Sequence, residues 1–306
     1  MVYSEAPGAA LRRLLARPEI LVVPGCADAL TARLAAAAGF ECVYATGAGI
    51  ANGLLGQPDV GLTTMTELVD QVGRICEAVT LPVLADIDTG FGNALNVRRT
   101  VRAMERAGAA GVQLEDQVFP KRCGHFDGKA VVSTSEMVGK VRAALEARRD
   151  EQLVVVARTD ALAVEGLEAA IVRAAAYAAA GADLVFVEAP RDRASLEALP
   201  RRIAAPLVAN MVEGGLTPLL SAAELQAMGY RLVLFANTAL RVAAAAIRDA
   251  FTELRSSGDA RGLLDAMLGW QERQALVGLP ELEALAARYD EDAPAVAPRV
   301  GTEETT

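Results

Sequence analysis

One short phrase recurs along this chain, and its clearest copy is Ala180-Gly181-Ala-Asp-Leu-Val-Phe-Val-Glu188. In this copy a glycine is followed by a short apolar strand, and glycine is the residue that most often closes a helix because it adopts the left-handed backbone. The phrase starts again at Ala38, at Ala107 and, more loosely, at Met228. The four copies predict four helix-to-strand junctions.

Four further apolar runs supply the remaining strands, at 20–24, 82–86, 153–158 and 206–210. Continuous rather than alternating apolar strands are typical of a parallel sheet that is covered on both faces. Alanine-rich segments with helical periodicity separate the strands, at 96–107, 134–149, 167–180, 221–228 and 238–256. Eight such units in 306 residues favour an α/β fold of the (β/α)8 TIM-barrel type over a doubly wound sheet.

The sequence predicts three regions along the chain. Residues 1–257 form the predicted catalytic barrel, and residues 258–289 continue as helix beyond the eighth unit. Leu264, Met267, Leu268 and Trp270 of this extra segment have no place in a complete barrel, so we expect it to pack on a neighbouring subunit. Residues 290–306 are rich in Pro, Glu and Thr and are predicted to be disordered.

The composition and net charge of the chain argue against nucleic-acid and membrane partners. The formal net charge of −9 argues against nucleic acid, because binding DNA or RNA normally requires a basic face. The chain begins without an apolar leader, and the apolar run 20–23 is too short to span a bilayer. The four cysteines have no metal-finger spacing, which is typical of a reducing, cytoplasmic compartment. Cys26, Cys42 and Cys76 lie in apolar or helical surroundings and are predicted to fill the core, unlike Cys123.

Polar side chains follow nearly every predicted strand. In a barrel these positions meet at the carboxyl-terminal rim, where the active site lies. The residues that follow the apolar runs are Thr46, Gly47, Asp86, Asp88, Glu115, Asp116, Arg158, Thr159, Asp160, Glu188, Asn210, Glu213, Asn237 and Thr238.

Four of these residues are hard oxygen donors with no histidine near them in sequence, namely Asp86, Asp88, Glu115 and Glu188. Such ligands select Mg2+ or Mn2+ over zinc, and magnesium commonly keeps several waters. Asp88 is the predicted direct ligand, with the other three acting in part through water. Carboxylates can also cap helices or pair with arginines, but burying four of them together without a cation would be costly.

Two glycine-containing loops adjoin this rim. Thr46-Gly47-Ala48-Gly49 is predicted to offer backbone N–H groups to a substrate carboxylate, and Gly90 and Gly92 allow close approach of an anion. Neither loop matches a Walker A or a GxGxxG nucleotide signature.

A polar segment after the fourth strand contains Lys121-Arg-Cys-Gly-His125, which includes the only histidine of the chain. The segment is too irregular for a helix, and we expect it to close over substrate as a lid. The flanking cationic groups would favour a Cys123 thiolate or make Cys123 an exchangeable proton donor. A surface loop with an incidental cysteine is the alternative, and the density of ionisable side chains favours function.

Together these motifs resemble the isocitrate lyase/phosphoenolpyruvate mutase superfamily. The resemblance runs from about Leu11 to beyond Leu240, and its most specific part is the Lys-Arg-Cys-Gly-His lid. The motifs that carry it are Asp86-Ile-Asp88-Thr-Gly-Phe-Gly92, Glu115-Asp-Gln117, Lys121-Arg-Cys-Gly-His125, Ala157-Arg-Thr-Asp160, Glu188-Ala189 and Asn210-Met-Val-Glu-Gly214.

The resemblance implies a Mg2+-dependent barrel enzyme that works through an enolate-like intermediate. It implies that Asp88 binds the metal directly and that Asp86, Glu115 and Asp59 bind through water. It also implies tetramers built from dimers that exchange the C-terminal helix, which fits the extra helical segment noted above.

In the lyase branch of this superfamily the lid cysteine protonates the departing enolate, which implies that role for Cys123. Tyr44 is the candidate for accepting the substrate hydroxyl proton, and Arg158 would hold and polarise the 2-oxygen. Lys121 and His125 are counted with the catalytic residues, and His125 would also hold a carboxylate. The predicted substrate-binding residues are Thr46, Gly47, Ala48, Asp59, Gly124, Glu188, Asn210 and Arg241.

The predicted reaction is retro-aldol cleavage of a 2-hydroxy di- or tricarboxylate of the methylisocitrate or dimethylmalate type, giving an α-keto acid and a carboxylate. The chain departs from many lyases at Thr46-Gly47-Ala48 and at Phe235-Ala236-Asn237-Thr238, which leaves the exact acid open. Arg241 could meet a second carboxylate or cap its own helix. The alternatives are phosphorus–carbon chemistry of the carboxyvinyl-carboxyphosphonate phosphorylmutase type, oxaloacetate decarboxylation and, more remotely, a non-catalytic oligomeric scaffold.

Overall fold

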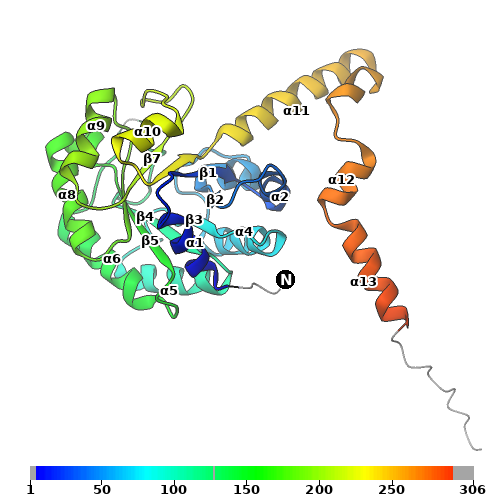
Figure 1. The fold of residues 1–306 in the computed structure, drawn as a ribbon. Coiled ribbons are helices and arrows are strands. Elements are labelled where there is room, and N and C mark those ends of the chain that lie inside the picture. Colours follow the sequence, from blue (N-terminus) through cyan, green and yellow to red (C-terminus); the bar gives the residue numbers. More distant parts are fainter. Residues whose placement is uncertain (1–4, 127, 292–306) are drawn as a thin grey trace, which may run out of the picture. The chain divides into compact units, whose positions relative to one another are not determined.

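The computed structural model describes residues 5–126 and 128–291. Eight parallel strands form a closed barrel in sequence order, and pairing of Val22 with Val233 joins the last strand to the first. This confirms the predicted TIM-type barrel (Figure 1). The strands are β1 (Leu21–Cys26), β2 (Val43–Ala45), β3 (Val83–Asp86), β4 (Gly111–Glu115), β5 (Val154–Thr159), β6 (Leu184–Val187), β7 (Leu207–Asn210) and β8 (Leu232–Phe235).

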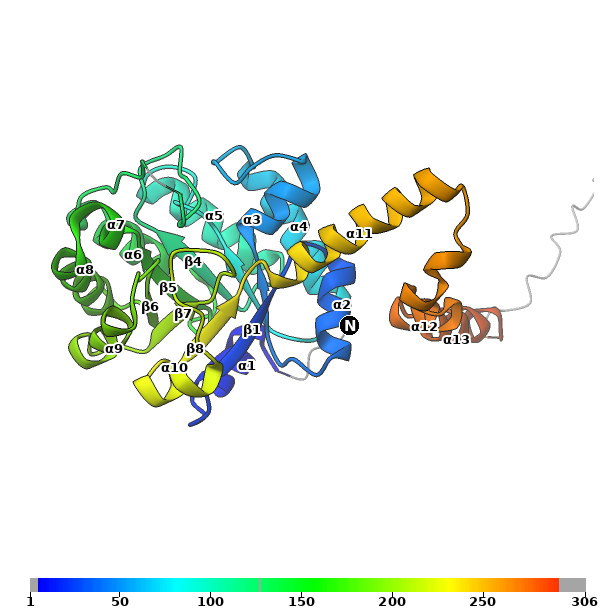
Figure 2. The same ribbon diagram turned by 90° about the horizontal axis from the view of Figure 1, so that it is seen from above.

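Helices connect the strands and surround the barrel, as the view in Figure 2 shows. The connecting helices are α2 (Ala29–Ala37), α4 (Met65–Ala78), α5 (Ala94–Arg106), α6 (Thr134–Ala147), α8 (Leu167–Ala179), α9 (Arg193–Arg202) and α10 (Ala222–Met228), and helix α11 (Thr238–Ser257) follows the last strand. Shorter segments are α3 (Gly47–Ile50), a π-helical turn (Ala51–Leu55) and α7 (Ala161–Glu165).

The barrel interior is filled by large apolar side chains, among them Leu84, Val156 and Phe186. Helix α1 (Pro7–Leu15) precedes the first strand and adds Leu11 and Leu14 to the same cluster. These apolar side chains occupy the barrel interior, and the polar residues follow them at the strand ends. Cys26, Cys42 and Cys76 are buried, as expected of core residues.

The predicted Thr46–Gly49 loop is instead the start of helix α3. The Thr46 hydroxyl accepts a hydrogen bond from the backbone N–H of Gly49 at 3.4 Å and so caps this helix. A threonine in extended conformation before a helix commonly has this role.

Residues up to Gly258 form one compact unit, and residues from Asp259 form a second. Helix α11, the last helix of the first unit, buries none of its residues, and its Val242 and Phe251 are 65% and 67% exposed. Apolar side chains on a helix normally pack against other apolar side chains, so the exposed apolar residues of α11 form a candidate contact surface.

The second unit covers the segment 258–289 that was predicted to continue as helix. It consists of a 3-10 segment (Arg261–Ala266), α12 (Trp270–Leu276) and α13 (Leu279–Glu291). Gly258 and Gly278 adopt left-handed backbone and interrupt the helical path. Within the second unit Leu264, Met267, Leu268 and Trp270 are exposed. Helix α13 enters the predicted tail as far as Glu291, and residues 292–306 lie outside the described residues.

In the part of the chain that the structure describes, no helix combines the length and the apolarity needed to cross a membrane.

Candidate active site

Asp86 and Asp88 face one gap at the end of β3. Asp88 adopts a left-handed backbone with φ of 48°, which turns the chain so that its N–H donates to Asp86 Oδ1 at 3.1 Å. A Cβ at Gly47 would lie 3.0 Å from Asp86 Oδ2 and 3.3 Å from Asp88 Oδ1. The absence of a side chain at Gly47 therefore keeps open the space that both carboxylates border.

Lys121 of the lid reaches into this acidic region. Its Nζ lies 2.8 Å from Asp88 Oδ1 and also pairs with Asp59, and its side chain is 3% exposed. Burial raises the pKa of Asp88 to about 6, although the Lys121 ammonium opposes that shift. Residues far apart in sequence thus meet here, and the lid contributes directly to the site.

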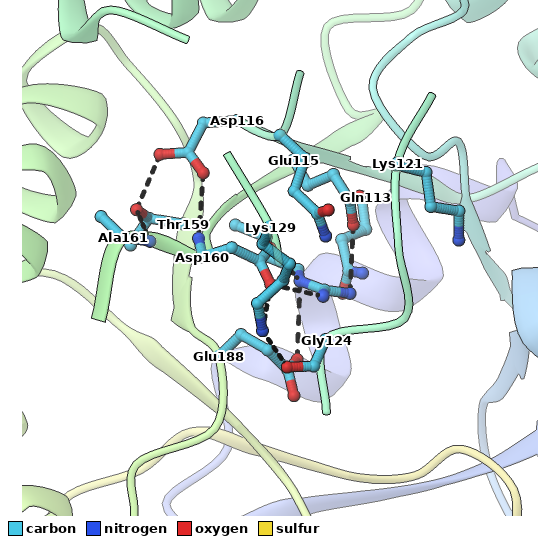
Figure 3. Close-up of polar contacts among 12 residues, drawn as sticks. Gln113, Glu115, Asp116, Lys121, Gly124, Lys129, Thr159, Asp160, Ala161 and Glu188 are labelled. Atoms are coloured by element: carbon cyan, nitrogen blue, oxygen red, sulfur yellow. Dashed lines mark hydrogen bonds and ion pairs between the residues drawn. The ribbon is translucent and has the colours of Figure 1, made fainter. Parts of the chain in front are cut away.

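Arg158 lies at the centre of three carboxylates. Its guanidinium donates to both oxygens of Asp160 at 3.0 Å, lies 3.1 Å from Glu115 Oε2 and 3.5 Å from Glu188 Oε2, and stacks 5.4 Å from the ring centre of Phe186. Figure 3 shows these acidic side chains converging from neighbouring strands. Bidentate pairing fixes the plane of a guanidinium, so Arg158 is held in one orientation.

The pKa values of the two glutamates beside Arg158, Glu188 and Glu115, shift in opposite directions. Burial would raise the pKa of Glu188, but Arg158 and His125 outweigh it and lower the pKa to about 2. Burial raises the pKa of Glu115 well above its ordinary value despite the nearby Arg158. Glu188 is therefore an anion across the physiological pH range, whereas Glu115 can hold a proton in the absence of a further cation.

The lid packs directly on this centre. A Cβ at Gly124 would lie 2.5 Å from Arg158 Nη2 and from Glu188 Cγ, so only glycine fits. Figure 3 shows Gly124 beside Glu188, with the Lys129 ammonium at the Gly124 carbonyl oxygen. His125 Nε2 lies 3.0 Å from Glu188 Oε1. The lid thereby brings Cys123 to the same rim.

Cys123 is a thiol rather than the thiolate that its cationic neighbours suggested. Burial is the largest influence on the group and raises its pKa, with Asp59 and Glu188 acting in the same direction. Desolvation and nearby carboxylates disfavour the anion more than the His125 backbone N–H and Arg158 favour it. The alternative role, an exchangeable proton donor, is consistent with this environment.

Tyr44 is buried beneath the carboxylates at the end of β2. Gln113 Nε2 donates to the Tyr44 hydroxyl oxygen at 2.7 Å. Burial, followed by the charge of Asp86, raises the pKa of Tyr44 well above its ordinary value. Tyr44 is therefore a phenol, and Gln113 fixes its position.

Carboxylates outnumber the cationic side chains at this rim. In the described ranges, the lysines and arginines that form ion pairs with carboxylates of the rim are Lys121, Lys129 and Arg158. They face the carboxylates of Asp59, Asp86, Asp88, Glu115, Asp160 and Glu188. Pairing with basic side chains was the alternative to a bound cation, and the folded chain brings Lys121 against Asp88 and Arg158 against Glu115 and Glu188. These pairs balance part of the negative charge of the rim.

The carboxylate oxygens of these residues are the type of ligand that a hard divalent cation binds. Asp86 and Asp88 share one gap, and Glu115 Oε1 is buried with no hydrogen-bond partner among the residues described. No group of three or more His, Cys, Asp and Glu side chains in the described residues is arranged to hold a metal as it stands. Magnesium needs only one or two direct protein ligands, so the donor chemistry and the excess of negative charge remain compatible with it.

Comparison with known proteins agrees with this geometry. The family described as phosphoenolpyruvate phosphomutase matches residues 11–255. The chain is 45% identical to 2,3-dimethylmalate lyase of Eubacterium barkeri over 92% of this chain and 97% of that protein. It is 44% identical to 2-methylisocitrate lyase of Aeropyrum pernix over 91% of this chain and 90% of that protein.

The chain belongs to the phosphoenolpyruvate mutase/isocitrate lyase superfamily.

Solved structures of this superfamily share the fold closely. Oxaloacetate acetylhydrolase in complex with 3,3-difluorooxalacetate gives a TM-score of 0.89 at 37% identity, covering 94% of this chain and 99% of that one. Phosphonopyruvate hydrolase in complex with oxalate and Mg2+ gives 0.85 at 32% identity, covering 93% and 99%. The resemblance that the motifs indicated is confirmed, and the chain is an enzyme of a superfamily in which its curated relatives are named as lyases.

Other predicted site residues of this superfamily member lie around the centre. Thr46 and Ala48 start helix α3 beside the Gly47 gap. Asn210 ends β7, and its Oδ1 is buried without a hydrogen-bond partner in the described ranges. Arg241 lies in α11, where its guanidinium contacts the Glu213 carbonyl oxygen and lies 3.8 Å from the Glu213 carboxylate. Its side chain is 56% exposed, so it borders the rim from outside.

Asp116 was predicted at the rim, but it points away from the other carboxylates (Figure 3). Its carboxylate accepts hydrogen bonds from the Thr159 and Tyr177 hydroxyls at 2.7 Å and from the Asp160 N–H at 2.9 Å. Neighbouring residues at a strand end project to opposite faces, so Glu115 faces the site and Asp116 faces the helices.

Sequence reasoning gave no role to Lys129, Asp160 or Gln113. The Lys129 side chain is 2% exposed and lies 3.4 Å from Asp160. Asp160 belongs to the Ala157-Arg-Thr-Asp160 motif, which was a usable signal for its contact with Arg158. The position of Lys129 had no comparable signal, because an isolated lysine is usually exposed.

Replacement of Gly124 tests whether the lid must lie this close. Gly124→Ala would force its methyl group against Arg158 and Glu188, so the lid cannot seat. We expect kcat/KM to fall about a hundredfold, since small displacements of catalytic groups have effects of this size. Gly139→Ala on helix α6 is the control, because no atom lies within 4 Å of the new Cβ. Equal activity of the two variants would contradict close packing of the lid.

The Asp116 cluster should contribute measurably to stability. Tyr177→Phe removes a donor from a buried carboxylate, and we expect the free energy of unfolding to fall by about 1.5–3 kcal/mol. Tyr230→Phe is the matched control, because the buried Tyr230 hydroxyl donates to the neutral Leu196 carbonyl at 3.0 Å. Urea unfolding should show the smaller loss for Tyr230→Phe, and the reverse order would remove the charged acceptor as the cause.

Proposed function

We propose that this protein is a Mg2+- or Mn2+-dependent carbon–carbon lyase. Its substrate would be a 2-hydroxy di- or tricarboxylate of the dimethylmalate or methylisocitrate type, and its products an α-keto acid and a carboxylate. The observation that carries the proposal is Arg158, fixed among three carboxylates beside the Asp86–Asp88 gap and covered by a lid that brings in the Cys123 thiol. The names of the curated relatives support the same chemistry.

Asp88 would hold the cation directly, with Asp86, Glu115 and Asp59 acting in part through water. When bound, the cation supplies electrostatic stabilisation of the oxyanion that forms during cleavage. The presence of Mg2+ in the solved complex of phosphonopyruvate hydrolase with oxalate supports the choice of cation. The excess of carboxylates over lysines and arginines at the rim supports it independently.

The residues of this chain would carry the proton transfers. Arg158 holds and polarises the 2-oxygen, and Lys121 and Gly124 seat the lid. Tyr44 is a phenol, so it can accept the hydroxyl proton of the substrate only while passing its own proton on, and Asp86 is the carboxylate that it contacts. The carbon–carbon bond then breaks to leave a keto acid and an enolate, and the Cys123 thiol gives its proton to the enolate carbon.

Carboxylate recognition would fall to groups around the centre. Thr46, Gly47 and Ala48 lie beside the gap, and Asn210 offers a buried amide. His125 and Glu188 complete this side of the site. Arg241 would act only at the outer edge, because Glu213 already engages it.

Cleavage of oxaloacetate is the second candidate. The structural match to oxaloacetate acetylhydrolase in complex with 3,3-difluorooxalacetate favours it, and decarboxylation of the same acid is a related outcome. Phosphorus–carbon chemistry is supported by the phosphonopyruvate hydrolase match. The names of the curated relatives, 2,3-dimethylmalate lyase and 2-methylisocitrate lyase, favour the lyase.

We further propose a cytoplasmic homotetramer built from helix-swapped dimers. The exposed apolar side chains of α11 and of the second unit support association through these segments. Light scattering of the full chain should give four times the monomer mass, and a monomer at micromolar concentration would contradict the assembly.

The function is tested with the full chain, Mg2+ and a substrate panel. The panel contains methylisocitrate, isocitrate, dimethylmalate, oxaloacetate and phosphonopyruvate, and release of keto acid, oxalate or phosphate is measured separately. We expect keto-acid release from a 2-hydroxy acid that stops when EDTA is added. Oxalate release from oxaloacetate alone would favour the second candidate, and turnover that EDTA does not change would refute the metal-dependent reaction.

A further inference from the structure

His125 is the only histidine of the chain, and one of its ring nitrogens has a defined partner. The backbone N–H of Leu216, in the segment after β7, donates to His125 Nδ1 at 3.0 Å. A backbone amide can only donate, so Nδ1 must present its lone pair. The ring proton of His125 is therefore on Nε2.

The neighbouring glycine makes room for this contact. A Cβ at Gly215 would lie 2.7 Å from His125 Nδ1 and 2.9 Å from His125 Cε1. The φ of Gly215 lies outside the left-handed range, so the backbone does not require glycine there, whereas the imidazole does. Gly214 is the opposite case, because its φ is 72° and a Cβ added there would have no atom within 4 Å.

The other side of the ring faces the active site. His125 Nε2 lies 3.0 Å from Glu188 Oε1, and Nε2 is buried without an aligned acceptor among the described residues. Its side chain is 11% exposed. A buried N–H in this situation is available to an oxygen of a bound ligand.

We infer that Gly215 and the Leu216 amide are positioning residues that hold the lid histidine in its Nε2–H form. His125 then serves the site as a hydrogen-bond donor to a carboxylate oxygen of the substrate, and it does not accept a proton through Nδ1. This role rests on the proposed lyase function, whereas the position of the ring proton does not. The segment after β7 thereby determines which ring nitrogen of His125 carries the proton, although His125 lies 91 positions earlier in the chain.

Solid-state NMR can read the ring proton directly. Untagged full-length protein labelled with 15N-histidine gives two ring nitrogen signals, because the chain contains one histidine. In protein sedimented at neutral pH without substrate, we expect a protonated Nε2 and an unprotonated Nδ1. Protonation at Nδ1 alone would overturn the inference.

Two glycine variants give the functional comparison. Gly215→Ala should displace the imidazole, so that the single pair of ring signals gives way to a mixture of both neutral forms. Loss of a hydrogen bond to a charged group corresponds to a fall in kcat/KM of about ten- to a hundredfold, mainly through KM. Gly214→Ala strains the backbone without touching His125, so the ring signals and KM should stay as in the wild type. Equal effects of both variants on the ring signals would refute the positioning role.

Failure of this inference is distinguishable from failure of the proposed function. If none of the panel substrates is cleaved while the wild type shows Nε2–H and Gly215→Ala loses it, the lyase proposal fails and the positioning stands. If a substrate is cleaved while wild-type Nδ1 carries the proton, the lyase proposal stands and the positioning fails.

Discussion

Asp88→Asn is expected to abolish Mg2+-dependent turnover, with kcat/KM falling about a thousandfold because charge stabilisation by a bound metal is lost. The substitution keeps the shape of the side chain and removes the charge that would bind the cation. It also deprives the buried Lys121 ammonium of one of its two carboxylate partners. Steady-state assay with the best panel substrate measures the loss.

Thermal stabilisation separates loss of the metal from loss of the fold. Ligands that bind only the folded state raise Tm, so Mg2+ with oxalate should stabilise the wild type and leave Asp88→Asn unchanged. Asp70→Asn on the exposed side of α4 is the control and should retain both activity and the Tm increase. Turnover of Asp88→Asn within threefold of the wild type would exclude Asp88 as the essential ligand.

Cys123→Ser is expected to slow carbon–carbon cleavage by about a hundred- to ten-thousandfold, the usual contribution of a positioned acid or base. A serine hydroxyl is a far weaker acid than a thiol and cannot supply the proton as readily. The metal site does not include Cys123, so the increase in Tm with Mg2+ and oxalate should persist. Unchanged turnover would remove Cys123 from the mechanism.

The pH profile gives a second measurement on the same residue. Because burial raises the pKa of the Cys123 thiol above its ordinary value, the acid form persists through neutral pH and is lost only in the alkaline range. The wild-type rate should therefore fall at alkaline pH above the ordinary thiol value. That fall should disappear in Cys123→Ser, whose hydroxyl does not titrate there.

The barrel and the rim that carries the candidate site can be predicted from the sequence alone. The glycine-then-apolar phrase and the four intervening runs correspond to the eight observed strands, because helix closure and continuous apolar burial are local properties of the chain. Parallel strands then place Asp86, Glu115 and Arg158 on one rim. The same reasoning did not locate the breaks in the C-terminal segment, because a glycine can also lie inside a helix and the sequence does not show that Gly258 and Gly278 adopt left-handed backbone.

The pairing of the charged side chains and the contacts that hold the lid follow from the folded structure. Lys121 is 62 positions from Asp59, and the Leu216 amide is 91 positions from His125, so no local pattern records either contact. Arg158 pairs with Glu115, Asp160 and Glu188 because three neighbouring strands bring these carboxylates within reach of its guanidinium. The Asp116 carboxylate instead faces the helices. Side-chain pairing in a buried site depends on distances set by the closed barrel, and the order of residues along the chain does not contain those distances.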